Sequence, residues 1–499
     1  MSPLVTIDPV TRIEGRARVT IELDDGGRVL DARVHVHELR GFETLCVGRP
    51  LREMPALTAR ICGICPVSHS LAAAKAGDVI LGSTPPPAAR KLRALLQLAQ
   101  LVQSHALSFF HLSAPDLFFG HDGDPARRSF FGLAEAAPEL ARDGVRVRRF
   151  GQEAIERVAG QRIHAAFAVP GGVARPLRPE ARDRILADLP EALAATERTL
   201  AWWKVAEPLH AEEAASCGNF ESLFLALVGP EGEMELADGR LRLVSASGER
   251  VADGVDPAGY DGLLGEGVAP WTYLKPAFHR PDGPPAHDGP PSTWGDVYRV
   301  GPLARLNVVS RCGTPRADRE LAAFRALARG PVLSTFHAHR ARLVEILFGL
   351  ERIGELLSDP AVLDGEVLAP PGTARPEGVG ACEAPRGTLF HHYRVDRDGL
   401  VTWANFVVAT GQNGLAMNRA VRQIAERFLS GVRITEGLLN RVEAGIRAFD
   451  PCLSCSTHAF GERRVALRLV GPGGRVLDEV EEGSIPGGPG RPGPGAVRR

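Results

Sequence analysis

Two C-x-x-C pairs, placed near opposite ends of the 499-residue chain, are the feature that constrains its fold most. The first pair, Cys62 and Cys65, lies in R-I-C-G-I-C-P, and the second, Cys452 and Cys455, lies in D-P-C-L-S-C. Two thiolates at this spacing can bind one metal ion. We therefore expect a single four-thiolate site, which requires a fold that brings the two ends of the chain together.

The spacing alone does not identify the metal. Four cysteines commonly hold a structural zinc ion, and spacing by itself favours zinc. Zinc ribbons, however, usually take both pairs from one short stretch of chain, whereas these pairs lie far apart. Soft thiolates suit nickel, iron or copper equally well, and each pair taken separately is also compatible with a redox motif.

The residues around the first pair favour a reactive thiolate. Pro66 suits the first turn of a helix that continues through the alanine-rich segment 70–76. Cys65 would then lie at the helix N-terminus, where free N–H groups and the helix dipole stabilise a thiolate. A bound cation would stabilise it more strongly.

Composition excludes several classes of protein. The chain has 59 basic and 60 acidic side chains, with a net charge of −1, so it lacks the basic surface of a nucleic-acid-binding protein. No apolar stretch approaches the ~20 residues that span a bilayer, and the N-terminus has no signal-peptide core. Eight cysteines are too few for a disulfide scaffold of this length. We expect a cytoplasmic protein without a membrane span.

Hydrophobic periodicity predicts an α+β fold dominated by helices, with a central helical bundle and small peripheral antiparallel sheets. Strands are expected at 16–23 and 29–36, around a turn at 24–27. Helices are expected at 56–81, 88–112, 178–210, 318–329, 337–357 and 417–447. Residues 221–310 and 359–381 are predicted to be loop-rich, the former with short strands.

The two cysteine segments resemble the nickel-binding motifs of nickel–iron hydrogenase large subunits. Residues 60–69 fit R-x-C-G-x-C-x-x-x-H, and residues 450–458 fit D-P-C-x-x-C-x-x-H. Further family landmarks occur in order, at 8–15 (D-P-V-T-R-I-E-G), 40–43 (R-G-F-E), 383–387 (E-A-P-R-G) and 412–413 (Q-N). Segments 299–305 and 387–394 resemble the soluble, bidirectional NAD-reducing subgroup.

The resemblance implies a ligand set and a reaction. Cys62 and Cys452 would bind nickel terminally, while Cys65 and Cys455 would bridge nickel to an iron that carries carbon monoxide and cyanide. The reaction implied is H2 ⇌ 2H⁺ + 2e⁻ by heterolytic cleavage. Cys452 is the expected base, because a metal-bound sulfur keeps a lone pair.

Two further residues match family positions with catalytic roles. Glu14, in R-I-E-G, matches the glutamate that relays the proton, although an ordinary salt bridge with Arg12 or Arg16 is the alternative. Arg386, in A-P-R-G, matches the arginine above the open metal position. It would polarise H2 there, hold Asp450 in place, or do both.

The remaining matches concern the surroundings of the metals. Pro385 and Thr410 are expected to line the diatomic ligands of the iron. Glu43 and His458 match residues near a magnesium or similar divalent cation. At Ser104, membrane-bound relatives often place an aspartate that faces the arginine, so Arg386 is expected to lack that partner.

A separate prediction concerns the residues that follow His458. In the family, a protease cuts just after this histidine once nickel-insertion factors have acted. By analogy, residues 1–458 form the catalytic domain and residues 459–499 form a removable extension. The extension contains a hairpin-like stretch, 464–470 and 476–480, before a glycine- and proline-rich end; a permanent strand pair is the alternative.

The electrons must leave through partner subunits. The other four cysteines are scattered rather than in a ferredoxin-like run, and no G-x-G-x-x-G joins a strand to a helix. We therefore expect a small iron–sulfur partner, together with diaphorase subunits that bind flavin and NAD. The alternatives are an H2-sensing regulatory protein, a scaffold protein on the same fold, and a structural zinc protein.

Overall fold

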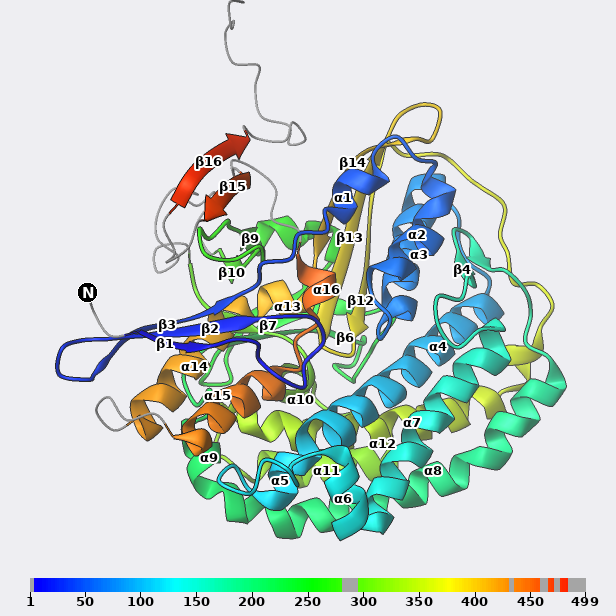
Figure 1. Ribbon diagram of the computed structural model, residues 1–499. Helices are drawn as coiled ribbons and strands as arrows, with labels where there is room; N and C mark the ends of the chain where they lie inside the picture. The colour runs from blue at the N-terminus through cyan, green and yellow to red at the C-terminus, as the bar shows by residue number, and fades with distance from the viewer. Residues whose placement is uncertain (1–3, 281–294, 430–434, 458–464, 471–475, 483–499) are drawn as a thin grey trace, which may run out of the picture.

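The computed structural model describes residues 4–280, 295–429 and 435–457, together with the strands 465–470 and 476–482. Long helices form the base of the molecule, and small sheets lie above and beside them (Figure 1). The principal helices are α3 (Pro66–Leu81), α4 (Pro87–Ala106), α7 (Pro138–Ala159), α8 (Pro179–Ala206), α11 (Pro315–Arg325), α12 (Ala338–Ser358), α14 (Gly414–Phe428) and α15 (Glu436–Phe449). The helix-dominated fold class is thereby confirmed.

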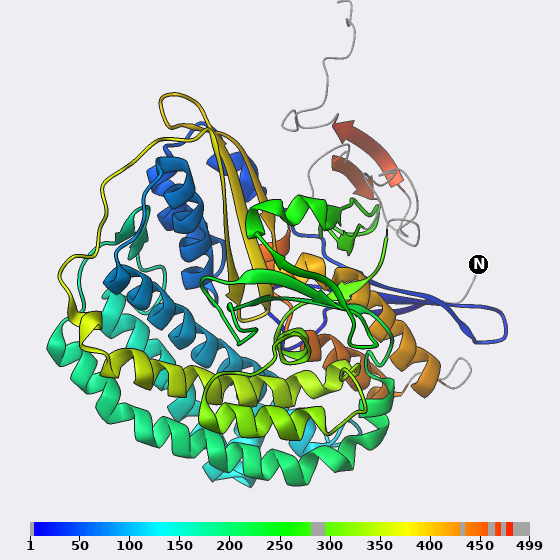
Figure 2. The same cartoon turned by 180° about the vertical axis from the view of Figure 1, so that it is seen from behind.

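Four of these helices form the central bundle. α4 packs against α7 and α12, and α8 packs against the same two helices (Figure 2). Their facing side chains belong to one continuous apolar core, which includes Leu101, Phe109 and Trp203, all fully buried. Burial of such a core is the main stabilising contribution in a chain of this size.

The strands form small, mostly antiparallel sheets, apart from a parallel pairing of β11 with β6. β1, β2 and β3 form one sheet, β6, β7, β8 and β11 a second, and β12, β13 and β14 a third. Their bounds are β1 (Leu4–Ile7), β2 (Arg18–Leu23), β3 (Val29–His35), β6 (Leu223–Val228), β7 (Arg240–Val244), β8 (Arg250–Val255), β11 (Tyr298–Arg299), β12 (Glu377–Ala384), β13 (Gly387–Val395) and β14 (Val401–Val407). The third sheet packs on α3, beside the cysteine region.

Short elements connect these helices and sheets. They include α1 (Phe42–Cys46), α2 (Met54–Thr58), α5 (Ala114–Phe119), η4 (Glu207–His210), α9 (Ala211–Ser216) and α16 (Leu453–Ser456). Within the described residues, no helix is both long and apolar enough to cross a bilayer.

Several predicted elements agree with the structure, and two boundaries are wrong. The helices expected at 88–112, 178–210 and 337–357 are confirmed, as are both strands of the first hairpin. The single helix expected at 56–81 is interrupted, because Cys62 is extended (φ −142°, ψ 142°) and Pro66 begins a new helix, α3. The helix expected at 417–447 is two helices, since Thr435 caps the start of α15 by accepting a hydrogen bond from the Leu438 N–H.

Other differences concern elements without a predicted counterpart. α7 was missed, and β12 begins inside the stretch 359–381 that was expected to be loop. In the C-terminal extension, the expected hairpin is confirmed as β15 (Val465–Val470) paired antiparallel with β16 (Val476–Glu482). The glycine- and proline-rich end, 484–499, lies outside the described residues.

Candidate active site

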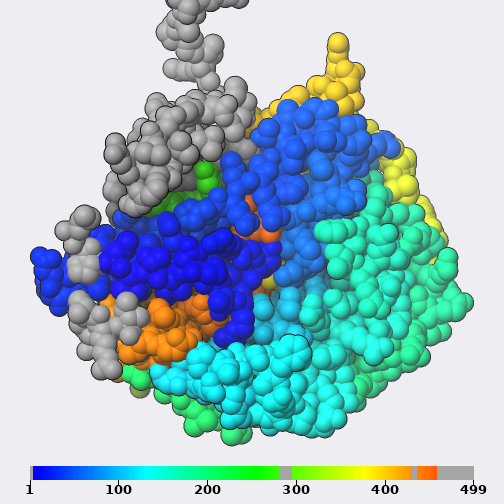
Figure 3. Space-filling view, viewed as in Figure 1, coloured from blue at the N-terminus to red at the C-terminus, as the bar shows by residue number. Residues whose placement is uncertain are grey.

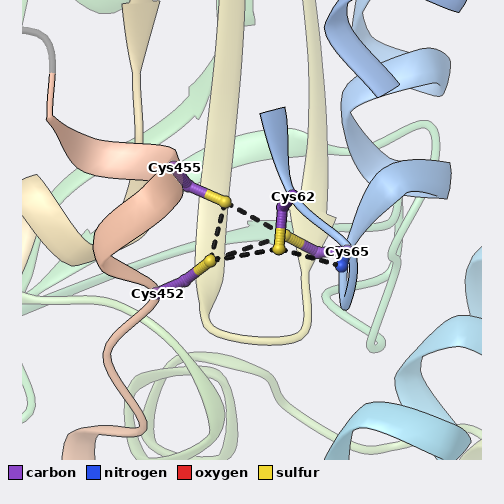
Figure 4. Close-up of side chains that lie close together, drawn as sticks. All are labelled: Cys62, Cys65, Cys452 and Cys455. Atoms are coloured by element: carbon purple, nitrogen blue, oxygen red, sulfur yellow. Dashed lines mark hydrogen bonds between the residues drawn. The ribbon is translucent and has the colours of Figure 1, made fainter. Parts of the chain in front are cut away.

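The four sulfur atoms of the two C-x-x-C pairs meet at one point in the protein (Figure 4). The Sγ–Sγ distances are 3.3 Å between Cys62 and Cys452, 3.2 Å between Cys65 and Cys455, and 2.7 Å between Cys452 and Cys455. All four cysteines are buried, and none forms a disulfide. The expectation that the two ends of the chain build one four-sulfur site is confirmed.

Local backbone geometry places the first pair. Cys65 is the residue immediately before α3, whose first position is Pro66, as expected. The N–H groups of Ile64 and Cys65 point at Cys62 Sγ, at 3.2 and 3.4 Å. The backbone N–H groups of the C-G-I-C turn therefore donate hydrogen bonds to the sulfur of Cys62 rather than to that of Cys65.

The second pair is placed by the N-terminal segment. Glu14 and Cys452 form a parallel β-bridge, and the Leu453 N–H donates to the Glu14 carbonyl at 3.3 Å. Gly15 has φ +86°, and a Cβ there would lie 2.7 Å from Leu453 Cβ. Glycine at this position therefore allows the two ends of the chain to pack against each other. Figure 3 shows the N-terminal (blue) and C-terminal (orange) segments side by side on one face.

The electrostatics of the cluster favour a cation. Hydrogen bonds from the neighbouring cysteines lower the pKa of Cys62 well below its usual range. Burial, with the neighbouring sulfurs, raises the pKa of Cys452 and Cys455 well above it. Hydrogen bonds from Cys452 and Cys455 lower the pKa of Cys65, but the adjacent Cys62 and burial outweigh them and raise it. Four thiolates can coexist here only with a cation between them.

Arg386 lies beside this cluster and is held by the residue two positions before Cys452. Its Nε donates to the Asp450 carbonyl oxygen at 2.6 Å, and its Nη2 donates to the Asp450 carboxylate at 3.1 Å. Burial opposes the charge, but Asp450 and the cysteine sulfurs outweigh it and raise the pKa of Arg386. Nη1 donates to Ser104 Oγ at 3.3 Å, so Ser104 is a neutral partner rather than an absent one.

A buried ion cluster fixes the loop that carries Arg386. Arg305 donates to Glu345 through two bonds of 2.7 Å and to Glu383 at 2.8 Å. The same guanidinium donates to the carbonyl oxygens of Ala384 and Pro385, each at 2.9 Å. The arginine and both carboxylates are fully buried. Arg305 and Glu383 belong to the motif segments 299–305 and 383–387, whereas the only sign of Glu345 is a charged residue within an otherwise apolar stretch of α12.

The Glu14 side chain contacts Ser454, which lies between the two cysteines of the second pair. Its carboxylate accepts a hydrogen bond from the Ser454 N–H at 3.0 Å and another from the Ser454 hydroxyl. The alternative salt bridges are wrong, because Arg12 pairs with Asp116 and Arg16 pairs with Asp8. Glu14 is half-buried, whereas Cys452 is buried, so the carboxylate lies between the cluster and the surface.

Thr410 and Pro385 lie around the same site in different ways. Thr410 Oγ accepts a hydrogen bond from the Cys452 N–H at 2.8 Å. Pro385 directly precedes Arg386, and its carbonyl oxygen faces Arg305.

Glu43 occupies a charged environment of its own. It is buried in α1, with Lys275 Nζ 3.6 Å from its carboxylate. Lys275 also pairs with Glu266 at 3.1 Å. His458, the other residue expected near a divalent cation, lies outside the described residues.

A histidine pair connects the first cysteine helix to the third sheet. His69 Nδ1 lies 3.0 Å from His391 Nε2, and His391 Nδ1 lies 2.8 Å from the Tyr393 hydroxyl. All three side chains are buried. No spacing in the sequence points to these contacts, because β13 and α3 are brought together only by the fold.

Known proteins provide independent comparisons. The family model described as nickel-dependent hydrogenase matches residues 40–119 and 289–458, and one described as HoxL-like matches residues 4–39. The NAD-reducing hydrogenase HoxS subunit beta of Cupriavidus necator is 41% identical, over 96% of this chain and 99% of that protein. A subunit of the F420-non-reducing hydrogenase vhc of Methanococcus voltae is 38% identical, over 95% of this chain and 99% of that protein.

Solved structures agree with these relatives. The crystal structure of an NAD⁺-reducing [NiFe]-hydrogenase in the H2-reduced state superposes with a TM-score of 0.86 at 46% identity. The alignment covers 92% of this chain and all of that chain. The Ni-Fe-Se hydrogenase from D. vulgaris Hildenborough superposes with a TM-score of 0.72 at 26% identity, over 92% of this chain and all of that one.

Proposed function

The chain belongs to the nickel-dependent hydrogenase family, as the catalytic subunit of an oxidoreductase that acts on H2, and we propose that it passes the electrons through iron–sulfur partners to NAD(P)⁺. The overall reaction would be H2 + NAD⁺ ⇌ NADH + H⁺. The observation that carries this proposal is the convergence of four buried sulfur atoms from the two ends of the chain.

The four cysteines fit a nickel–iron centre in number, chemistry and position. Soft thiolates are suitable ligands for both metals, and the cluster cannot hold four negative charges without a cation. We propose that Cys62 and Cys452 bind nickel terminally, and that Cys65 and Cys455 bridge it to an iron with carbon monoxide and cyanide ligands. When bound, this centre supplies the open position at which H2 is split. Thr410 and Pro385 would line the iron side.

The protein would receive the proton at sulfur and carry it outward. We propose Cys452 as the base and Glu14 as the next carrier, because Glu14 is joined to the Cys452 backbone and lies nearer the surface. The Ser454 hydroxyl, hydrogen-bonded to the Glu14 carboxylate, holds that carboxylate in place. A positioned carboxylate of this kind is a suitable proton carrier.

Arg386 would supply a fixed positive charge at the site. Its bonds to the Asp450 carbonyl and carboxylate hold the guanidinium in one orientation, and burial strengthens its field. We propose that it polarises H2 beside the open metal position. Its contact with Asp450 supports a positioning role for Asp450 at the same time.

A second cation is proposed at Glu43. A buried carboxylate suits a hard ion such as magnesium, with His458 as a further ligand. Lys275, 3.6 Å from Glu43, would adjust to the additional positive charge.

The partners and the maturation route are proposed from the relatives. The NAD-reducing relative supports a small iron–sulfur partner, with diaphorase subunits that bind flavin and NAD. Eight cysteines without a disulfide suit a reducing compartment, which supports the cytoplasm. Nickel-insertion factors and a maturation protease would act before assembly.

We propose that residues 459–499 are removed on maturation. In support, 92% of this chain covers the whole of the solved NAD⁺-reducing chain. Intact-mass measurement of the active complex should find the chain ending at His458. Active, nickel-loaded protein that still carries residue 499 would overturn this proposal.

The function is tested by H2-dependent reduction of NAD⁺ with the purified complex. Infrared spectra of the same sample should contain bands from iron-bound cyanide and carbon monoxide. Bands without NAD⁺ reduction, but with reduction of an artificial dye, would reject the acceptor and keep the hydrogenase. Zinc in place of nickel, with no such bands, would reject the proposed metal centre.

A further inference from the structure

A separate group of metal-ligating side chains lies away from the four cysteines. Among the described residues, the ligand atoms of His121, His210 and Glu213 lie within 4.8 Å of one another. His121 follows α5, His210 ends η4, and Glu213 lies in the first turn of α9. His210 immediately precedes α9, and Glu213 is the third residue of that helix.

A backbone hydrogen bond fixes the tautomer of His210. Its Nε2 lies 2.9 Å from the Leu117 carbonyl oxygen, which can only accept a hydrogen bond. Nε2 therefore carries the hydrogen, and Nδ1 keeps the lone pair. A second ring nitrogen bonded to a backbone carbonyl is the usual arrangement for a ligating histidine. The Trp203 ring stacks on the imidazole of His210 and helps to hold it in place.

Glu213 already has charged side chains as neighbours. His121 Nδ1 lies 3.4 Å from Glu213 Oε1. Arg441 donates to Glu213 Oε1 at 3.1 Å, while both of its terminal nitrogens bind Asp122 at 2.9 and 2.7 Å. Asp122 therefore offsets much of the arginine charge. The second carboxylate oxygen of Glu213 has lone pairs for a further cation.

A small cavity adjoins the cluster. His121 and Glu213 both line it, and its volume of about 20 Å³ is room for one water molecule. Ser113 and His339 also line this cavity. Ser113 Oγ and His339 Nδ1 are buried and have no hydrogen-bond partner among the described residues. Buried polar atoms without protein partners favour an ordered water in the cavity.

We propose that His121, His210 and Glu213 bind one divalent ion of the zinc type, with water in the adjoining cavity as the fourth ligand. Two imidazoles, one carboxylate and one water form a recognised zinc ligand set. Bonds of about 2.0–2.2 Å would draw the three protein atoms closer together. The ion would link the segment after α5 to η4 and α9, which lie far apart in the sequence. This site does not depend on the nickel-binding cysteines.

The test uses the assembled complex, in which nickel and iron occupy the cysteine site. The complex is stripped with a chelator, incubated with Zn²⁺, desalted and analysed for zinc, nickel and iron. Wild-type protein should retain one zinc more than the variants Glu213→Gln and His210→Gln, with nickel and iron unchanged. The matched control is Glu212→Gln, because Glu212 is half-exposed on the same helix and pairs with Arg427.

A second readout guards against misfolded variants. Zn²⁺ should raise the melting temperature of the wild type and of Glu212→Gln, but not that of Glu213→Gln, because a ligand stabilises only the state that binds it. The affinity for zinc should fall by at least about 100-fold in Glu213→Gln, since losing even an outer partner costs 10–100-fold. Equal zinc content and equal thermal shifts in all variants would overturn the proposal.

Discussion

Arg386 is joined to Asp450 by two hydrogen bonds, one to its backbone carbonyl at 2.6 Å and one to its carboxylate at 3.1 Å. Asp450 has a left-handed backbone (φ 54°) at the end of α15, two residues before Cys452. The arginine beside the four-sulfur cluster is therefore bound to the segment that carries Cys452 and Cys455. Movement of Arg386 would therefore displace this segment, and movement of the segment would displace Arg386.

Replacement of Arg386 by lysine should therefore reduce activity without removing the metals. Lysine keeps the charge but lacks the rigid, planar set of donors with which Arg386 binds both Asp450 oxygens and Ser104. Arg386→Lys should lower H2 turnover by about 100-fold, in the range for loss of one fixed donor, with nickel content unchanged. Arg394→Lys, at an exposed position on β13, is the control. Unchanged turnover in Arg386→Lys would contradict the role.

Glu14 is the position that tests proton transfer. The glutamine in Glu14→Gln is nearly isosteric with glutamate and can still hydrogen-bond to Ser454. It cannot carry a proton as a carboxylate does. H2 oxidation should fall by about 10²–10⁴-fold, while nickel and iron contents stay at the wild-type level. Asp25→Asn, in the exposed turn between β2 and β3, is the control. Full turnover in Glu14→Gln would show that the proton leaves by a path that does not include Glu14.

The Arg305 cluster should dominate local stability. Arg305→Met leaves Glu345 and Glu383 buried without their cation, which costs about 3–5 kcal/mol. Denaturant unfolding of the chain measures this change in free energy. Arg352→Met, which breaks an exposed pair with Glu355 on α12, should cost less than about 1 kcal/mol. A similar loss of unfolding free energy in both variants would show that the buried cluster contributes no more to stability than the exposed pair does.

Stability should also fall in mild acid because of His105. Burial, against the opposing effect of Glu345, lowers the pKa of His105 to about 4. The unfolded chain therefore binds this proton more readily than the folded one, and stability decreases as the pH falls from about 6.5 to 4. In His105→Gln, the slope of the free energy of unfolding against pH should be smaller by about 1.4 kcal/mol per pH unit over this range. An unchanged slope in urea unfolding between about pH 4 and 7 would exclude this contribution.

Local patterns predicted the long amphipathic helices and the first hairpin well. α4, α8 and α12 each combine length with apolar spacing, and the turn at 24–27 marks the hairpin. The apolar spacing of 56–81 did not reveal the break at Cys62, whereas Pro66 did indicate the helix that begins after it. β13 was missed since seven of its nine residues are buried, which leaves no alternation to detect.

The residues of the candidate site were likewise predictable only in part. The cysteines, Glu14 and Arg386 lie in short motifs and were predicted from them. The partners that hold them were not, because Ser454 meets Glu14, and Arg305 meets Glu345 and Glu383, only through long-range packing. Contacts of this kind leave no spacing pattern in the sequence.

Nickel bound by sulfur from both ends of the chain is the central requirement, and nickel X-ray absorption of the purified complex tests it most directly. The spectrum should contain a shell of sulfur neighbours from Cys62, Cys65, Cys452 and Cys455. In the variants Cys62→Ser and Cys452→Ser, which alter opposite ends of the chain, that shell should shrink or nickel should be lost. Nickel surrounded only by nitrogen and oxygen, or equally bound in both variants, would contradict the assignment.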